Sequence, residues 1–266
     1  MTKKTDVVEM ATRRRPILVV TSGRGRTGKS VLLSLLATLN AGRYPLKVID
    51  ADKNGSLSDR YPHAVRPDVP VGEDRRVWIE AQFDKMVEAA GTDQQHDMFL
   101  DLGAGDLLLS RWGHEVQLAQ ALSDMGVEPV LIHTLGASDQ DVSDLADLET
   151  NGIFAPEKTI VVLNIGLIAT GRDALAAFDL VLKSEPVQAI ERRGGRIVWL
   201  PPFEGMDKLE KEKLRFSDVL SGRNLRSLGF VDQIRARKWL RERVPAALTP
   251  VADWLPEMVD LSEGRA

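Results

Sequence analysis

The chain of 266 residues contains no cysteine. This absence excludes disulfide-stapled folds, cysteine-ligated metal centres and thiol catalysis. Its four histidines are scattered along the sequence and show no metal-ligand spacing. No apolar run approaches the roughly 18 residues of a membrane-spanning helix, and the apolar run at 17–20 is too short for the core of a secretory signal. We therefore expect a cytoplasmic protein with no membrane partner.

The chain also lacks an excess of charge of one sign, with 35 lysines and arginines against 39 aspartates and glutamates. This balance excludes a protein that is basic throughout but allows a local basic patch. The hydrophobic fraction of 43% is typical of a folded globular chain. The length fits one large domain. We expect a flexible basic arm over 1–15 and a single domain over 16–266, helical in its C-terminal region from about 205 to 260.

Short β-branched runs alternate with longer stretches of helical pattern. The expected strands are Ile17–Thr21, Lys47–Asp50, Met98–Asp101, Val127–His133, Thr159–Asn164 and Arg196–Leu200. The expected helices lie near 29–41, 75–90, 106–125, 138–150, 172–193 and 205–221. Continuous apolar strands that alternate with helices are typical of a parallel sheet covered on both faces. The expected fold class is α/β, a doubly wound, mostly parallel sheet flanked by helices.

Two local features modify this alternation. Residues 53–74 are rich in glycine, proline, aspartate and serine, which predicts a long loop. Pro245 is expected to stop or kink any helix that enters it from Val244, because proline lacks the N–H that a helix interior needs.

The strongest functional signal is the sequence GRGRTGKS, which satisfies the pattern G-x-x-x-x-G-K-[ST] between an expected strand and an expected helix. Its glycines let the backbone curl so that several N–H groups point at one phosphate, and the following helix adds the positive end of its dipole. Lys29 is predicted to reach the β- and γ-phosphates, and Ser30 to bind Mg²⁺. The predicted cofactor-binding residues of this P-loop are Gly23, Arg24, Gly25, Arg26, Thr27, Gly28, Lys29 and Ser30.

A P-loop also needs carboxylates that hold the metal, directly or through water, and orient the attacking water. Asp50 and Asp52 close the second expected strand, and Asp101 closes the third. Ligands bind at the carboxyl ends of parallel strands in such sheets. The sequence therefore predicts that these three acids lie beside the P-loop.

Taken together, these motifs resemble the ParA/MinD family of ATPases. Val19–Ser30 resembles its deviant Walker A motif, Asp50-Ala51-Asp52 with 54–58 its second motif, and Asp101-Leu102-Gly103-Ala104-Gly105 its Walker B segment. Val161–Asn164 resembles the strand whose asparagine reads the adenine edge, and 200–202 falls at the family's proline loop beside the base. The likeness covers roughly residues 16–204. It implies a doubly wound sheet that binds ATP and Mg²⁺, closes as a homodimer around ATP and hydrolyses it slowly.

The resemblance also implies roles for the matching positions. Lys29 would bind phosphate and Ser30 the metal, with Asp50 and Asp101 supporting the metal through water. Asp52 would position or activate the attacking water, and Asn164 and Pro201 would contact the base. Arg24 stands where the family has its signature lysine, which reaches the partner's phosphate, and Arg26 where it has a second glycine. Arginine keeps the positive charge of lysine, so we expect dimerisation on ATP to persist. Because arginine is also longer and planar, we expect hydrolysis to be slow.

Residues 223–243 form a basic stretch within an acidic chain. Its cations are Arg223, Arg226, Arg235, Arg237, Lys238, Arg241 and Arg243, against two acids. Cations on one surface bind DNA phosphates without reading sequence, and the resemblance implies this use for a C-terminal basic surface. On an ideal α-helical wheel, however, the cations between 235 and 243 do not share one side, so a solvated helix face is the alternative. The acidic, proline-containing residues that follow do not suit a membrane anchor.

We interpret the chain as a ParA-like ATPase that forms an ATP-dependent homodimer and binds non-specific DNA and an unidentified protein partner. Its expected role is plasmid partition or conjugative DNA transfer. One alternative is a nucleotide-dependent protein-binding switch with little hydrolysis, which Arg24 and Arg26 would suit. Another is a metabolic P-loop ligase or kinase, although no residues indicate a pocket for a second substrate.

Overall fold

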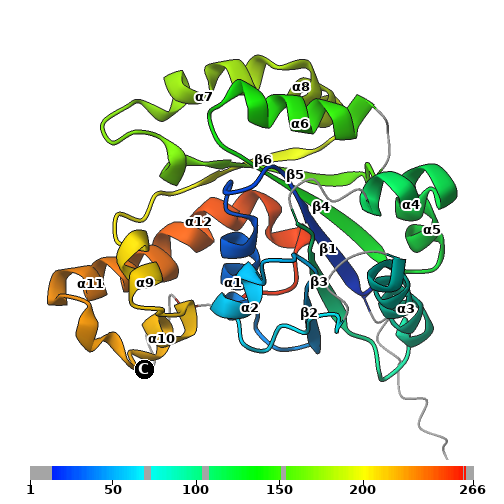
Figure 1. Cartoon of the computed structure of the whole chain (residues 1–266), viewed down its shortest axis with the longest axis horizontal. Coiled ribbons are helices and arrows are strands. Elements are labelled where there is room, and N and C mark those ends of the chain that lie inside the picture. The colour runs from blue at the N-terminus through cyan, green and yellow to red at the C-terminus, as the bar shows by residue number, and fades with distance from the viewer. Residues whose placement is uncertain (1–13, 69–72, 104–107, 151–153, 260, 262–266) are drawn as a thin grey trace, which may run out of the picture.

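The computed structural model describes residues 14–68, 73–103, 108–150, 154–259 and 261. One six-stranded parallel sheet has the order β2-β3-β1-β4-β5-β6. Its strands are β1 (Ile17–Ser22), β2 (Leu46–Asp50), β3 (Asp97–Asp101), β4 (Glu128–Leu135), β5 (Lys158–Asn164) and β6 (Arg196–Leu200). Helices cover both faces (Figure 1). The expected doubly wound α/β fold is confirmed, and each expected strand is present.

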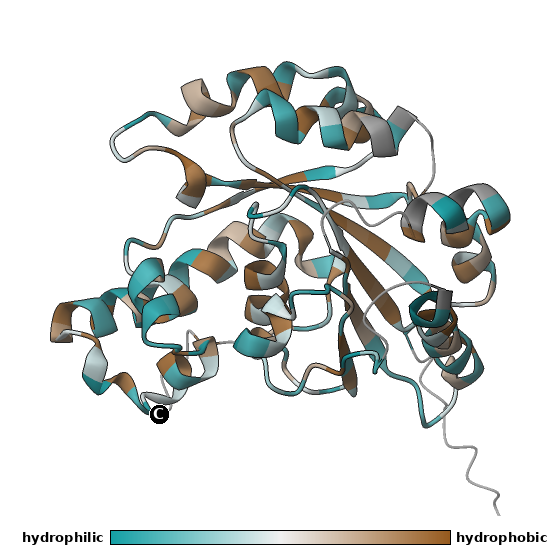
Figure 2. Cartoon of the chain, viewed as in Figure 1, coloured by the Kyte–Doolittle hydropathy of each residue, from teal (hydrophilic) through white to brown (hydrophobic). Residues whose placement is uncertain are grey.

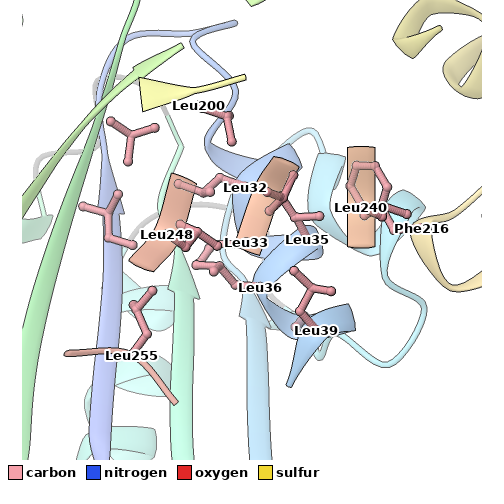
Figure 3. Close-up of a cluster of buried hydrophobic side chains, with 14 of the residues drawn as sticks. Leu32, Leu33, Leu35, Leu36, Leu39, Leu200, Phe216, Leu240, Leu248 and Leu255 are labelled. Carbon is pink, nitrogen blue, oxygen red and sulfur yellow. The ribbon is translucent and has the colours of Figure 1, made fainter. Parts of the chain in front are cut away.

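One face of the sheet packs against α1 (Lys29–Leu39) and the C-terminal helices. Leu32, Leu33, Leu35, Leu36 and Leu39 of α1 share a buried cluster with Leu240, Leu248 and Leu255 (Figure 3). The helical elements on this side are α2 (Ser56–Arg60), α9 (Met206–Lys211), α10 (Phe216–Ser221), η2 (Leu225–Ser227), α11 (Phe230–Lys238), η3 (Trp239–Arg243), α12 (Val244–Leu248) and η4 (Thr249–Trp254). The C-terminal helices therefore share one core with the helix that follows the P-loop.

The other face carries two further buried clusters. The first contains residues of α3 (Glu73–Ala89), α4 (Leu108–Val116) and α5 (Leu118–Asp124). The second contains residues of α6 (Asp139–Thr150), α7 (Ala174–Lys183) and α8 (Glu185–Arg192). Figure 2 shows the mainly hydrophobic strands that run between these layers. Neighbouring side chains of a strand point to opposite faces, so Val19 joins the α1 side while Leu18 and Val20 join the α3 side.

Three expected helices are interrupted. The stretch 106–125 divides at Gln117 and the stretch 205–221 near Lys213, because both residues adopt left-handed backbone angles, with φ of 46° and 52°. The stretch 172–193 divides at Ser184, whose extended backbone ends α7, and Pro186 occupies the first turn of α8. Apolar periodicity predicted helix but did not reveal these turns.

The structure also corrects smaller expectations. The expected loop 53–74 contains the short helix α2, and α3 begins at Glu73. Of the two outcomes expected at Pro245, the stop is wrong, because the chain continues from the π-helical turn η3 into α12, whose first turn contains the proline. The kink stays a prediction. Strand β4 runs two residues beyond the expected end, to Leu135.

The end of the expected basic arm over 1–15 contacts the rest of the domain through Arg14. Arg14 Nη1 donates to Asp97 Oδ1 at 2.9 Å, and its guanidinium lies 4.1 Å from the centre of the Tyr44 ring. Residues 1–13 lie outside the described residues. Among the helices that the structure describes, none is long and apolar enough to cross a membrane.

Candidate nucleotide-binding site

The GRGRTGKS loop leaves the carboxyl end of β1, between β3 and β4, and leads directly into α1. The chain order places β2 and β3 on one side of β1 and β4, β5 and β6 on the other. Such a switch point opens a crevice at the carboxyl edge of the sheet, where ligands bind. The predicted strand–loop–helix context of the motif is therefore present.

Two glycines of the loop have no room for a side chain. A Cβ on Gly23, where φ is 131°, would lie 2.6 Å from the Thr134 carbonyl oxygen. A Cβ on Gly28, where φ is 103°, would lie 2.7 Å from Asn164 Nδ2. Glycine is needed at both positions for its conformational freedom and for close packing against the neighbouring strands.

Side-chain hydrogen bonds hold the GRGRTGKS loop against β4 and β5. Thr27 Oγ1 donates to the Arg24 carbonyl oxygen at 2.8 Å and lies 2.8 Å from Thr134 Oγ1. Asn164 Nδ2 donates to the Thr27 carbonyl oxygen at 2.9 Å. Asn164, predicted to contact the base, therefore also positions the P-loop, and its predicted role toward a base stays a prediction.

Lys29 is held inside the curl of the loop. Its side-chain Nζ donates to the carbonyl oxygens of Gly23 at 2.9 Å and Arg24 at 3.0 Å. Burial lowers the pKa of this ammonium, while the nearby carboxylates, Asp101 foremost, act in the opposite direction. The lysine therefore lies where the backbone N–H groups of the loop would gather an anion.

Ser30 and Asp101 form the second half of the site. Ser30 Oγ donates to Asp101 Oδ2 at 2.6 Å, and Thr21 Oγ1 donates to Asp101 Oδ1 at 3.0 Å. Asp101 is fully buried, and burial raises its pKa to about 6 even though these two hydrogen bonds and Lys29 oppose the rise. The structure thus brings together the hydroxyl and the carboxylate predicted to hold Mg²⁺.

The two acids after β2 have different surroundings. Asp50 Oδ2 accepts hydrogen bonds from Ser58 N and Ser58 Oγ, both at 2.7 Å, and so holds the first turns of α2. Asp52 is partly exposed, and its Oδ1 accepts from Asn54 N at 3.0 Å. A Cβ on Gly103 would lie 3.2 Å from Asp52 Oδ1, so Asp52 lies beside the end of β3. The predicted roles of Asp50 toward metal and of Asp52 toward water stay predictions, and Ala104 and Gly105 lie outside the described residues.

Arg24, Gly25 and Arg26 form the exposed rim of the loop. Arg26 adopts a left-handed backbone with φ of 69°, a conformation that glycine adopts at little cost. The rim is therefore positively charged and open to solvent, while the interior of the loop is fixed.

Pro201 lies just after β6, the strand beside β5, and its carbonyl oxygen accepts a hydrogen bond from Trp239 Nε1 at 2.9 Å.

Sequence reasoning missed three residues that position this site. Thr134 fastens Thr27 but lies one residue beyond the expected end of its strand. Ser58 binds Asp50 from within the expected loop, and Arg75 Nη1 donates to the Ala51 carbonyl oxygen at 2.9 Å. A polar residue at the end of an apolar strand was the available signal for Thr134, whereas no sequence pattern predicted the other two contacts.

The residues present fit a nucleoside triphosphate with Mg²⁺. The loop supplies a backbone cradle and a buried lysine, and Mg²⁺ takes few protein ligands because phosphate oxygens and waters complete its shell. Ser30 and Asp101 match this requirement, although no cluster of three histidine, aspartate or glutamate side chains suited to a metal occurs within the described parts of the chain. The fold is a P-loop nucleoside triphosphatase fold.

Comparisons with solved structures return similar chains at low sequence identity. The chain is similar to FtsY of Thermotoga maritima, with 16% identity, a TM-score of 0.45 and coverage of 71% of this chain and 64% of that one. It is also similar to FtsY of Elizabethkingia anophelis in complex with GDP, with 12% identity, a TM-score of 0.44 and coverage of 71% of this chain and 58% of that one. A variant of Cyanothece McdA in complex with ATP has 17% identity, a TM-score of 0.40 and coverage of 87% of this chain and 97% of that one. The chain thus spans less than two thirds of these two FtsY chains.

No family model matches the chain, and no curated protein matches its sequence. The assignment of the nucleotide site therefore depends on the chain's own residues described above.

The cations of the basic stretch do not form one surface. Arg223 and Arg226 are exposed around η2, and Arg237 is partly buried, with its guanidinium over Gly222. Arg241 is also partly buried. Arg235, Lys238 and Arg243 line one cleft together. An ideal α-helical wheel also places these three on one side, and Arg237 and Arg241 are the cations between 235 and 243 that do not line the cleft.

Proposed function

We propose that this protein is a slow ATPase that dimerises when ATP is bound and acts in plasmid partition or conjugative DNA transfer. In this proposal the ATP state binds DNA without reading its sequence, and a protein partner stimulates hydrolysis. The single observation that carries the nucleotide chemistry is the fastened P-loop, with Lys29 inside its curl and Ser30 bonded to Asp101. The resemblance of the motifs to ParA/MinD ATPases favours ATP and the DNA role.

The chain's own residues would divide the work at this site. Loop N–H groups and Lys29 would bind phosphate oxygens and stabilise charge as it develops on them. Ser30 and Asp101 would hold Mg²⁺, whose chemistry is to draw negative charge from the phosphates. Asp52 is partly exposed beside Gly103 and so remains able to orient a water molecule. None of these groups is a strong general base, which suits slow turnover.

The exposed rim of the loop supports dimerisation. Arg24 occupies the position at which the family resemblance implies a contact with the partner's phosphate, and its side chain is exposed. A guanidinium can bind phosphate oxygens in a bidentate manner. Two copies that face each other across their loops would each supply Arg24 to the other's nucleotide.

One observation favours a second candidate, a nucleotide-dependent protein-binding switch with little hydrolysis. Phe230, Val231 and Ile234 of α11 are exposed, Phe230 by 77%. Exposed apolar side chains of this kind are typical of protein contacts and have no use in phosphate binding. The two candidates differ in whether the ATP state binds DNA.

The deciding experiment measures binding of a labelled non-specific DNA duplex with ATP–Mg²⁺, with ADP–Mg²⁺ and without nucleotide, at low and moderate salt. We expect binding only with ATP–Mg²⁺ and a steep loss of affinity with salt, because phosphate contacts release counterions. The Lys29→Ala variant should not bind the duplex. ATP-dependent dimers without DNA affinity would instead favour the switch, and turnover above about 1 s⁻¹ would contradict the slow ATPase.

A further inference from the structure

A cleft of about 410 Å³ lies between the loop after β6 and the helical run of α11 and η3. Arg235, Lys238 and Arg243 line it from the helical side, and Pro202 and Phe203 line it from the loop. Glu204 and Trp239 also line it. Figure 1 shows that this helical run projects from one end of the molecule, where α9 lies beside it. The cleft thus joins cationic and aromatic groups from two separate parts of the chain.

The aromatic wall of the cleft is held firmly in place. Trp239 is buried and is fixed by its hydrogen bond to the Pro201 carbonyl oxygen. The Phe203 ring lies 5.5 Å from the Trp239 ring at an interplanar angle of 31°, and Phe216 packs against the same indole at 5.9 Å. Phe203 is itself only partly buried. A flat ring that enters the cleft would therefore meet a preformed apolar surface.

Two of the three cations of the cleft form ion pairs, all of them long. Arg235 lies 3.6 Å from Glu204, the one acid that lines the cleft, and 3.7 Å from Asp232, while Lys238 lies 3.9 Å from Glu242. These distances exceed hydrogen-bond length. Within the described part of the chain, no carboxylate oxygen lies within 4 Å of a nitrogen of Arg243. The lining itself carries three cations against one acid, Glu204, and long ion pairs of exposed side chains leave N–H donors free for an anion.

The cleft is large enough for one nucleotide, because pockets for small ligands start at roughly 300 Å³ and this one measures about 410 Å³. Single-stranded nucleic acid is recognised by cations that follow its backbone and by aromatic rings on which its bases stack. Bases of an intact duplex are stacked inside the helix and cannot reach such a wall.

We propose that this cleft binds one unpaired nucleotide of DNA, its phosphate on Arg235, Lys238 and Arg243 and its base against Phe203 and Pro202. The inference rests on the DNA-binding part of the proposed function and makes it more specific. It predicts that single-stranded DNA, or a duplex with an unpaired end, is preferred over an intact duplex.

The test is fluorescence anisotropy with ATP–Mg²⁺ and two probes, a labelled 20-nucleotide oligo-dT and a 20-base-pair duplex. The cleft variant is Lys238→Ala/Arg243→Ala, and the matched control is Arg172→Ala/Lys183→Ala, which removes the same charge from exposed positions outside the cleft and outside the basic stretch. We expect the cleft variant to lose about 30-fold in oligo-dT affinity and the control less than threefold. Phe203→Leu, which keeps an apolar side chain but removes the ring, should lose about tenfold, since stacking contributes about 1–3 kcal/mol per base.

Each contrary outcome has a distinct meaning. Equal losses in the cleft variant and the control would overturn the inference, because binding would then reflect diffuse charge. If the duplex binds as tightly as oligo-dT, or if the cleft variant binds the duplex as the wild type does, the inference about the cleft is overturned. A DNA-binding ATPase would still stand. Weaker binding of a fluorescent ATP analogue with unchanged oligo-dT binding would assign the cleft to the free nucleotide. No binding of either probe would overturn both the inference and the DNA role.

Discussion

Arg26 occupies a left-handed backbone conformation inside the P-loop, next to Thr27, whose side chain is fully engaged. A residue with a Cβ pays roughly 1–2 kcal/mol for such angles, whereas glycine does not. The surrounding hydrogen bonds hold the loop in shape in spite of this cost. Strain of this kind persists where neighbouring contacts fix the backbone.

Replacing Arg26 by glycine should therefore stabilise the protein. We expect Arg26→Gly to raise the free energy of unfolding by about 0.5–1 kcal/mol, since relief of strain exceeds the added entropy of the unfolded chain. Urea denaturation without nucleotide measures the change. Arg24→Gly is the matched control, because Arg24 is equally exposed but has no positive φ, and it should not stabilise. A stability gain of the same size in both variants would show that loss of charge, not backbone strain, is responsible.

At the scale of elements, a buried polar cluster joins β4, β5, α6 and α8 on the face opposite α1. Arg193, just after α8, donates to both carboxylate oxygens of Glu149 on α6 and, at 3.1 Å, to Thr159 Oγ1 on β5. His133 of β4 lies 3.5 Å from the same carboxylate. Burial alone would raise the pKa of Glu149, but the nearby His133 and the hydrogen bonds and charge of Arg193 lower it to about 2.

This shift predicts a pH-dependent contribution to stability. Because the pKa of Glu149 is lower in the folded than in the unfolded state, its contribution is fully present above pH 4.5 and is lost as the pH falls toward 2. We expect Glu149→Gln to lower the free energy of unfolding at pH 7 by about 2 kcal/mol, after allowance for solvent screening. The difference from the wild type should shrink steadily below pH 4.5.

Denaturation with urea at a series of pH values provides the measurement. Glu157→Gln, at an exposed position near the start of β5, is the control and should change stability by less than about 0.5 kcal/mol at every pH. A deficit in Glu149→Gln that is the same at pH 3 and pH 7 would contradict a contribution from the ionised carboxylate.

The elements also show what a sequence can and cannot predict. All six strands and the P-loop context followed from local patterns, since buried parallel strands are continuous apolar runs and GRGRTGKS has a fixed spacing. The bond of Asn164 to Thr27 depends on how distant segments pack, which no local pattern contains. The bond of Ser58 to Asp50 spans only eight residues, but it depends on how the chain after β2 turns back, which its composition does not specify. The π-helical turn before Pro245 was equally hidden, because a wheel assumes one uniform winding. The approach of Pro202 and Phe203 to the cations of the cleft was not predicted either, because it depends on tertiary packing.

At the scale of the whole molecule, one buried cluster connects the nucleotide site to the C-terminal helices. Helix α1 starts at Lys29 in the P-loop, and its leucines pack against Leu240 and Leu248, the first of which lies in η3 between Lys238 and Arg243. A tightly packed core transmits displacement instead of absorbing it. If the cleft binds DNA as proposed, nucleotide at the loop and DNA at the cleft would contact opposite ends of this packed layer, which would suit an ATPase whose DNA binding depends on ATP.

Dimerisation is the step at which Arg24 should matter, because its exposed side chain lies at the rim of the loop and outside the fastened interior. Light scattering with ATPγS–Mg²⁺ should give twice the monomer mass for the wild type and the monomer mass with ADP. Arg24→Ala should weaken the dimer at least tenfold, while binding of a fluorescent ATP analogue by the monomer changes less than threefold. Arg24→Lys keeps the charge and should restore most of the dimer. Arg43→Ala removes an exposed cation just before β2, at the opposite edge of the sheet, and should dimerise like the wild type. If Arg24→Ala dimerises as tightly as Arg43→Ala, the loop rim does not form the interface, and any dimer must be built on another surface.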